Sequence, residues 1–198
     1  MTRLLLIRHG ETDWNRDRRI QGVTDIPLND TGRRQAAQTA QLLRTILPAD
    51  VPATVVASDL LRAQETAAII ARELGLDEPV LSPLLRERAY GEGEGLDVAE
   101  FTARFGGHTT EVPGAESPAA LRVRAIEGLR QAIAGSRRRT GTAQAALIAV
   151  AHGALIREVV AHASGGDFPA PGQRLSNGSV HEFLVERDRM RLLSFSAA

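Results

Sequence analysis

Two apolar runs in this chain end in the same way. Residues 4–7 and residues 147–151 are continuous aliphatic stretches, and each leads into a histidine followed by glycine, at His9 and His152. Short runs that are apolar at every position are typical of strands buried on both faces of an α/β sheet. Ligands of such sheets bind beyond the carboxyl ends of the strands. The pattern therefore predicts two histidines, with Arg8 beside the first, that converge on one pocket.

The rest of the sequence alternates strand-like and helix-like segments, which predicts a three-layer α/β/α sandwich. The central sheet is expected to be mostly parallel, with a C-terminal antiparallel hairpin. Strands are expected at residues 3–8, 53–57, 80–81, 147–151, 179–185 and 190–195, and helices near 14–18, 31–46, 60–74, 97–105, 117–135 and 153–163. No repeat or linker is evident, so residues 1–198 are interpreted as a single domain.

Two of these helices carry specific expectations about their first turns and faces. Asn29 or Asp30 is suited to cap the helix that begins near residue 31, because short polar side chains accept hydrogen bonds from free amides. Ser58 and Asp59 are expected to cap the following helix in the same manner. The buried face of that helix is expected to carry three residues at helical spacing, Leu61, Ala68 and Leu74.

The composition restricts the chemistry. The 24 basic residues, all of them arginine, balance 24 acidic residues, so no long-range field favours nucleic acid or a membrane. Without lysine there is no Schiff-base nucleophile, and without cysteine there is no thiol nucleophile or cysteine metal site. No stretch has the length of a transmembrane helix or the form of a signal peptide, which fits a cytoplasmic enzyme.

Four segments carry a resemblance to a known family. Residues 6–12 (Leu-Ile-Arg-His-Gly-Glu-Thr) resemble the signature of the histidine phosphatase superfamily, the phosphoglycerate-mutase-like proteins, and residues 151–153 resemble its second histidine. Residues 58–66 fit the family's motif around a phosphate-binding arginine, and residues 85–91 resemble its proton-donor segment. The resemblance covers nearly the whole chain and implies the phosphoglycerate-mutase-like fold.

Phosphoryl transfer requires a nucleophile, a cationic cradle and a proton donor. His9 is interpreted as the nucleophile that forms a phosphohistidine, since a neutral imidazole can attack phosphorus once its other nitrogen is held. Arg8, Arg62 and His152 are expected to form the cradle, because guanidinium forks match phosphate oxygens. Glu87 is the expected general acid on the basis of the resemblance. Glu11 and Asp13 compete for this role because they lie closer to His9 in sequence.

Further substrate contacts follow from the resemblance. Asn15 resembles the family's polar contact to the phosphate, and Gln21 with Gly22 resembles a pair in the substrate loop. A cap segment, about residues 88–116, is expected to set specificity. The expected substrate-binding set is Arg8, Asn15, Gln21, Gly22, Arg62, Arg88, Tyr90, His152 and Gly153. No metal is expected, because His108, His162 and His181 show no metal-ligand spacing.

The family contains both phosphatases and mutases. Arg88 and Tyr90 resemble the mutases, but the chain lacks the lysine that follows them there and has no arginine pair in residues 100–120. Residues 113–117 resemble the phosphatase branch, so a phosphatase acting on a small phosphorylated metabolite is favoured. The alternatives are a phosphoglycerate mutase that uses 2,3-bisphosphoglycerate, or a non-catalytic phosphate-binding domain. No other cofactor and no nucleic-acid or membrane partner is expected, and a homodimer is compatible with the chain.

Overall fold

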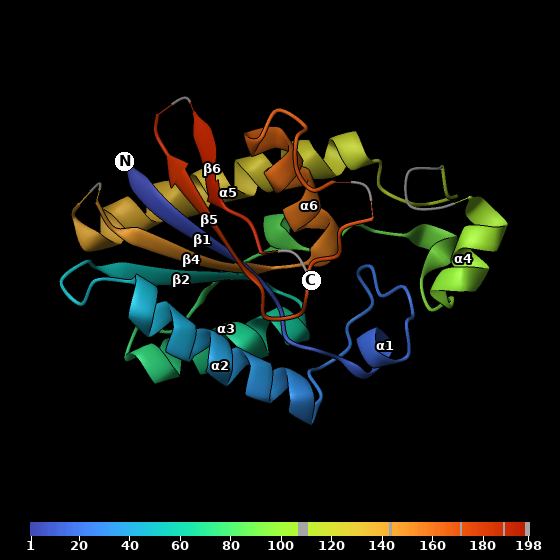
Figure 1. Ribbon diagram of the computed structural model, residues 1–198, viewed down its shortest axis with the longest axis horizontal. Helices are drawn as coiled ribbons and strands as arrows, with labels where there is room; N and C mark the ends of the chain where they lie inside the picture. The colour runs from blue at the N-terminus through green and yellow to red at the C-terminus, as the bar shows by residue number, and fades with distance from the viewer. Residues whose placement is uncertain (107–110, 143, 171, 188, 197–198) are drawn as a thin grey trace.

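One six-stranded sheet, in the order β3-β2-β4-β1-β5-β6, runs through the protein. The computed structural model describes residues 1–106, 111–142, 144–170, 172–187 and 189–196 (Figure 1). The strands are β1 (Thr2–Arg8), β2 (Ala53–Ser58), β3 (Val80–Ser82), β4 (Ala146–Ala151), β5 (Val180–Val185) and β6 (Met190–Ser194). The first four are parallel, whereas β5 and β6 are antiparallel to their neighbours. This confirms the predicted sheet and its C-terminal hairpin.

Strands β1 and β4 lie side by side in the middle of the sheet. Their register pairs Arg8 with Ala151, so the residues that follow, His9 and His152, leave neighbouring strands at the same level. Every residue of the run 4–7 is fully buried, because helices cover both faces of the sheet. This explains why the strand sequence is continuously apolar instead of alternating.

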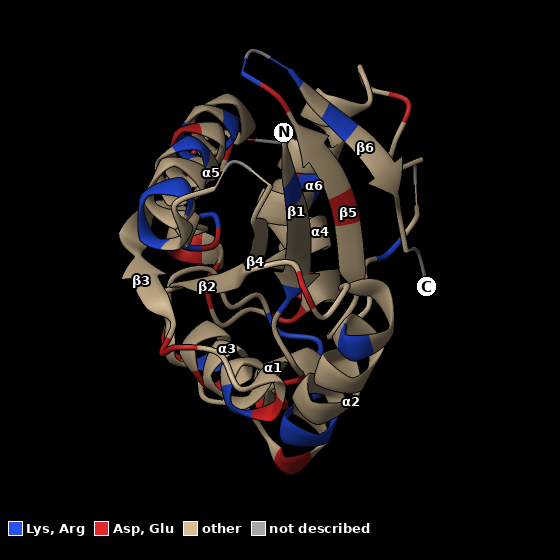
Figure 2. Ribbon diagram, turned by 90° about the vertical axis from the view of Figure 1, so that its left-hand side faces the viewer, with Lys and Arg blue, Asp and Glu red and all other residues tan. Residues whose placement is uncertain are grey.

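The helices form the two outer layers. They are α1 (Asp13–Arg16), α2 (Asp30–Ile46), α3 (Leu61–Leu74), α4 (Val98–Phe105), α5 (Pro118–Thr140) and α6 (Gly153–Ala163), with 3-10 turns at Pro83–Leu85 and Gly91–Gly93. Helices α2 and α3 pack on one face of the sheet and α5 and α6 on the other (Figure 1). Figure 2 shows the charged residues concentrated on the helices around the sheet.

The cap segment, residues 88–116, lies beyond the carboxyl ends of β1 and β4, at the same end as α1 (Figure 1). Its described part has a small core of its own, in which Tyr90, Phe101 and Val112 pack with Ile20 from the segment after β1. His108 lies outside the described residues. The cap segment therefore lies next to the strand ends at which the sequence predicts the site.

Two expectations about α3 were wrong. Ser58 and Asp59 do not cap it: the N-cap is Leu60, and Oδ1 of Asp25 accepts from the amide of Leu61, the first helical residue, at 2.7 Å. The expected buried residues Leu61 and Ala68 are exposed. The buried residues of α3 are instead Arg62, Ala63, Thr66, Ala67, Ile70 and Ala71, of which Ala63, Ala67, Ile70 and Ala71 belong to the core on this face of the sheet. Leucine spacing was misleading because three of these six residues are alanines.

The structure also shows how α2 begins and where α5 ends. Asn29, one of the two expected caps, accepts a hydrogen bond from the Gly32 amide, at 2.9 Å. Helix α5 continues five residues beyond its expected end at 135, to Thr140, and Gly141 closes it in the left-handed conformation that favours glycine. In the described ranges, no helix combines the length and apolar character that a membrane span requires.

The first turn of α2 touches the backbone that follows β1, and this contact generates a stability prediction. A Cβ on Gly32 would lie 2.1 Å from the Glu11 carbonyl oxygen, so the two segments would have to separate. We expect Gly32→Ala to lower the free energy of unfolding by about 2 kcal/mol, measured by urea denaturation. The matched control is Gly135→Ala within α5, where a Cβ would meet only ordinary contacts, the nearest at 3.5 Å. That variant should keep or gain stability, and equal losses in both would contradict the prediction.

Candidate active site

Two histidines meet where β1 and β4 end. The ring centroids of His9 and His152 are 5.1 Å apart, and both side chains are buried. The Nδ1 atom of His9 lies 2.6 Å from the Gly10 carbonyl oxygen. Because a carbonyl only accepts, Nδ1 carries the proton, and the lone pair of the neutral ring sits on Nε2. The predicted convergence of the two strand ends is therefore present in the fold.

Arg62 connects the second histidine to the segment after β1. This side chain is only 1% exposed, and its guanidinium donates to the carbonyls of Gly22, at 2.7 Å, and Thr24, at 2.9 Å. Its Nε donates to Nδ1 of His152, at 3.3 Å. Since Nδ1 of His152 accepts, the neutral ring carries its proton on Nε2.

Two buried donors near these rings have no hydrogen-bond partner among the described residues. They are Nε of Arg8 and Nε2 of His152. The Arg8 guanidinium is otherwise anchored by Nη1, which donates to the Leu175 carbonyl. A buried polar group left without a partner costs about 1–3 kcal/mol, so two such donors in one place indicate a binding site for an acceptor.

Burial, together with the positive charge of this cluster, keeps both histidines neutral. Burial is the largest cause that lowers the pKa of His9 well below its usual 6.5, and Arg62 and Arg8 lower it further. Burial also lowers the pKa of His152, with Arg62, His9 and Arg8 acting in the same direction. Burial lowers the pKa of Arg62 to about 10, so this guanidinium stays charged at neutral pH. Two cations and two neutral imidazoles thus share a site suited to an anion.

Glu87 approaches the same cluster from the other side. Its Oε2 accepts from the Ala154 amide, at 3.0 Å, and its Oε1 accepts from the amides of Leu155 and Arg88, at 3.1 and 2.9 Å. A Cβ placed on Gly153 would lie 3.5 Å from Nε of Arg8 and 3.8 Å from Oε2 of Glu87. The carboxylate therefore caps α6 and borders the arginine with the unpaired donor.

Comparison with known proteins identifies, for nearly the whole chain, the same family that its motifs resemble. Residues 4–198 match the family model of the histidine phosphatase superfamily (branch 1). The uncharacterized phosphatase PhoE of Bacillus subtilis (strain 168) is 34% identical over 199 residues, 99% of this chain and 95% of that protein. The probable phosphoglycerate mutase GpmB of Enterobacter sp. (strain 638) is 45% identical over 102 residues, 52% of this chain and 45% of that protein.

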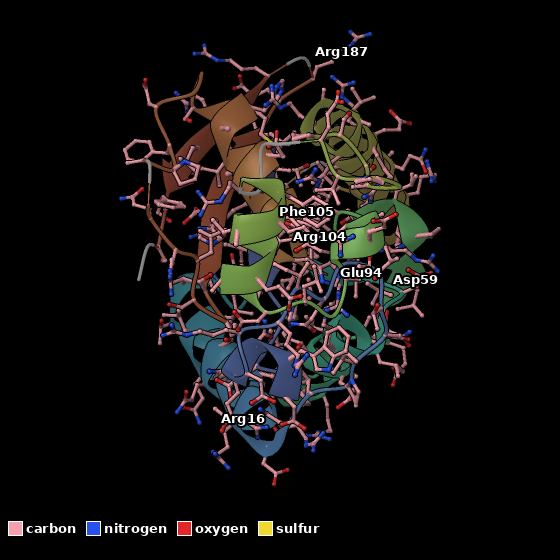
Figure 3. The ribbon with its side chains drawn as sticks, turned by 90° about the vertical axis from the view of Figure 1, so that its right-hand side faces the viewer. Arg16, Asp59, Glu94, Arg104, Phe105 and Arg187 are labelled. Carbon is pink, nitrogen blue, oxygen red and sulfur yellow. The ribbon has the colours of Figure 1, made fainter. Side chains whose placement is uncertain are left out.

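A solved structure extends the similarity to the fold. A mycobacterial glucosyl-3-phosphoglycerate phosphatase, solved with VO3, superposes with a TM-score of 0.81 at 29% identity, covering 99% of both chains. This chain belongs to the histidine phosphatase superfamily. Its five expected catalytic residues, His9, Glu87, Arg8, Arg62 and His152, lie close together beyond the carboxyl ends of β1 and β4. Figure 3 shows the molecule from the side on which α1 and the cap helix α4 lie.

The expected substrate-binding residues after β1, Asn15, Gln21 and Gly22, make hydrogen bonds within and next to their own loop. The Oδ1 atom of Asn15 accepts from the Thr12 amide, and Oγ1 of Thr12 donates to Oε1 of Gln21, at 3.0 Å. Gly22 has a φ of 56°, and its carbonyl faces Arg62. The loop thus holds Arg62 in place; direct contacts of Asn15 and Gln21 with a substrate remain predictions.

Arg88 and Tyr90 are buried within the cap segment. The Nε atom of Arg88 donates to the Glu116 carbonyl, at 2.7 Å, and its guanidinium lies over the Tyr90 ring, 4.9 Å from the centroid. Tyr90 packs edge-on against Phe101. These contacts tie Arg88 and Tyr90 to the rest of the cap, and their expected substrate contacts stay a prediction.

Three residues at the site had no role assigned from the sequence. Oγ1 of Thr66 accepts from the Gly10 amide, at 3.0 Å, and donates to the Arg62 carbonyl, at 2.7 Å. Nδ2 of Asn177 donates to the carbonyl of His9, at 2.9 Å. Thr66 belongs to the recognised motif of residues 58–66, which was the available signal, whereas Asn177 lies in a loop with no pattern of its own.

The third of these, Arg124 on α5, holds the backbone that carries Glu87. Its Nη1 and Nη2 donate to the carbonyls of Leu84, Arg86 and Glu87, at 3.0, 2.9 and 3.2 Å. Its Nε and Nη2 also bind both carboxylate oxygens of Glu116, at 2.9 and 2.7 Å. This one guanidinium therefore holds the backbone of residues 84–87, which carries the carboxylate.

The lowered histidine pKa values predict how stability depends on pH. An unfolded histidine binds a proton near pH 6.5, whereas folded His9 and His152 remain neutral well below it. Protonation thus favours the unfolded chain, and the free energy of unfolding should be level above pH 6.5 and fall as the pH decreases from there. Urea denaturation between pH 7.5 and pH 5 measures this slope. His9→Gln should make it shallower, and parallel curves for variant and wild type would refute the assignment.

Proposed function

We propose that this protein is a phosphomonoesterase that transfers the phosphoryl group of a small phosphorylated metabolite first to His9 and then to water. The observation that supports it best is that a nucleophilic nitrogen and unpaired N–H donors lie together at the ends of β1 and β4. Nε2 of His9 offers a lone pair, while Arg8 and His152 offer N–H donors that have no partner among the described residues. A phosphoryl group needs both, because a lone pair can attack its phosphorus while N–H donors bind its charged oxygens.

In the first step, Nε2 of His9 attacks phosphorus and the bond from phosphorus to the ester oxygen breaks. The ring keeps its Nδ1 proton, which the Gly10 carbonyl holds, and this stabilises the positive charge that the phosphorylated imidazole gains. Arg8, Arg62 and His152 stabilise the oxygens of the transferring group. In the second step, a water molecule attacks phosphorus and the bond to Nε2 breaks, which restores neutral His9.

Glu87 supplies the proton for the leaving alkoxide and takes one from the attacking water. The two other carboxylates considered for this role bind other groups. Glu11 accepts from the side-chain amide of Asn29, at 2.9 Å, and Asp13 pairs with Arg16 on the exposed face of α1, at 2.9 Å. Glu87 is the carboxylate that borders Arg8, which supports its assignment as the acid and base.

The mutase remains the second candidate, since relatives with that name exist and the cap carries Arg88 and Tyr90. A mutase would need 2,3-bisphosphoglycerate to load His9, whereas the proposed phosphatase needs no metal or cofactor. Incubation with 3-phosphoglycerate, with and without 2,3-bisphosphoglycerate and in the presence of EDTA, separates the two. Release of free phosphate supports the phosphatase, and formation of the isomer supports the mutase.

Removal of the nucleophile gives the primary test. We expect His9→Ala to lower turnover of p-nitrophenyl phosphate by more than about 10³-fold, because no other group can accept the phosphoryl group. Wild-type enzyme quenched with denaturant at alkaline pH should carry an acid-labile, base-stable phosphoryl label on His9, seen by mass spectrometry, and His9→Ala should carry none. Equal turnover by the variant would reject His9 as the nucleophile, and no turnover by either protein would leave a phosphate-binding domain.

The role of Glu87 is tested by comparing leaving groups. Glu87→Gln should slow hydrolysis of an alkyl phosphate by about 10²–10⁴-fold, since the alkoxide then leaves without a proton. Hydrolysis of 2,4-dinitrophenyl phosphate should change far less, because its leaving group needs no proton. Glu87→Asp, which retains a carboxyl group, is the matched control and should recover part of the loss. Equal losses on both substrates would exclude Glu87 as the acid.

A further inference from the structure

The side-chain amide of Asn15 is held through only one of its two ends. Its Oδ1 accepts from the backbone amide of Thr12 and from Nδ2 of Asn177, at 3.2 Å in each case. A backbone amide only donates, so the atom that faces it is the oxygen, and this fixes the orientation of the group. Within the described ranges, the Nδ2 atom of Asn15 has no hydrogen-bond partner. The two N–H groups at this end can therefore bind an acceptor.

Asn177 lies in the loop between α6 and β5 and binds two groups that follow β1. Its Nδ2 donates to the carbonyl oxygen of His9, at 2.9 Å, as well as to Oδ1 of Asn15. Both of these oxygens only accept, so the NH2 end of Asn177 must face them, and both of its N–H groups are used. Because one nitrogen binds both oxygens, the amide of Asn15 lies beside the backbone of the proposed nucleophile.

The bond from Asn177 matters because a carboxamide can rotate by half a turn and exchange its oxygen and nitrogen. After such a rotation, the NH2 group of Asn15 would face the Thr12 amide and the NH2 group of Asn177, and both hydrogen bonds would be lost. The Thr12 hydroxyl, 3.2 Å from Oδ1, can donate or accept, so it favours neither orientation. Without Asn177, only the Thr12 amide would oppose the rotation.

The unpaired end of Asn15 adds to the donors already found at the site. Nε of Arg8 and Nε2 of His152 are buried and have no hydrogen-bond partner among the described residues. Nδ2 of Asn15 is a third donor without such a partner, and it lies near His9. A rotated amide would present its oxygen in place of these N–H groups and would repel a phosphoryl oxygen. The orientation of Asn15 thus decides whether this side chain attracts or repels a phosphate at His9.

We propose that Asn177 is a positioning residue of the phosphate site, which fixes the Asn15 carboxamide so that its N–H groups face the oxygens of the phosphoryl group. The inference rests on the proposed phosphatase activity. It assigns the contact with the substrate to Asn15, and none to Asn177. Because Asn177 acts through Asn15, its effect on phosphate affinity should disappear once the Asn15 side chain is removed.

The test is a double-mutant cycle on the affinity for inorganic phosphate, measured by isothermal titration calorimetry. We expect Asn177→Ala and Asn15→Ala each to weaken binding by about tenfold, because each removes the same oriented donor. The double variant should bind phosphate about as weakly as Asn15→Ala alone, whereas independent contributions would give a loss of about a hundredfold. The kcat/KM for p-nitrophenyl phosphate should follow the same pattern.

Asn29→Ala is the matched control. The side-chain amide of Asn29 also donates to the segment after β1, to Oε1 of Glu11 at 2.9 Å, and its Oδ1 caps α2. This variant should lower the midpoint of thermal unfolding and leave the affinity for phosphate unchanged. Thermal unfolding also verifies that each variant is folded, and Asn177→Ser takes the place of Asn177→Ala in the cycle where the alanine variant is not.

The outcomes separate this inference from the proposed function. If the losses of the two single variants multiply in the double variant, or if Asn177→Ala binds phosphate as tightly as the wild type, the role of Asn177 is overturned. An equal loss of affinity in Asn29→Ala would also overturn it, since the effect would then be a general loosening of the segment. If the wild type hydrolyses p-nitrophenyl phosphate no faster than His9→Ala, the phosphatase proposal fails, whereas the binding cycle still decides whether Asn177 orients Asn15.

Discussion

The site depends on a buried guanidinium whose hydrogen-bond partners are uncharged. Arg62 is almost fully buried, and it donates to the carbonyls of Gly22 and Thr24 and to Nδ1 of His152. Burial of a cation without a directly bonded carboxylate is costly, and here it lowers the pKa of Arg62 to about 10. An anionic ligand offsets this cost. The bond from Nε of Arg62 to Nδ1 of His152 also fixes the tautomer of this histidine, so its Nε2 carries the proton and is a donor.

The loop that satisfies Arg62 is held by a carboxylate on its opposite side. Glu94 accepts from the amides of Val23 and Thr24, both at 3.0 Å, while the carbonyls of the same loop point towards Arg62. The peptide groups thus lie between a negative and a positive charge. Their N–H ends point towards Glu94 and their C=O ends towards Arg62, so the peptide dipoles interact favourably with both charges. The negative charge of Glu94 also opposes the lowering of the Arg62 pKa by burial. Gly22 is required here, because its φ is 56° and a Cβ would lie 2.1 Å from Oε1 of Glu94. Cap and phosphate cradle are therefore coupled through one short loop.

The sequence predicted those parts of the site that follow from strand burial or from a local motif. His9 and His152 were identified because a strand buried on both faces must be apolar until it ends, and neighbouring parallel strands end together. The contacts by which Arg124 and Asn177 hold the backbone of the site could not be predicted in this way. Each of these contacts is made to a backbone carbonyl, and carbonyls exist at every residue and leave no mark in the sequence. The error at Leu61 has a related cause, since a face built from alanine gives a weak periodic signal.

Glu87 both caps α6 and, in the proposed reaction, carries a proton, and these two tasks distinguish its oxygens. Oε1 accepts from two amides, those of Arg88 and Leu155, whereas Oε2 accepts from Ala154 alone. A proton on either oxygen weakens the N–H bonds that this oxygen accepts, so protonation of Oε2 disturbs fewer of them. Oε2 is also the Glu87 oxygen on the side of Arg8, since a Cβ built on Gly153 would lie 3.8 Å from Oε2 and 3.5 Å from Nε of Arg8. The oxygen that costs least to protonate is thus the one nearest the phosphate cradle, and Oε1 can keep α6 capped while the proton is transferred.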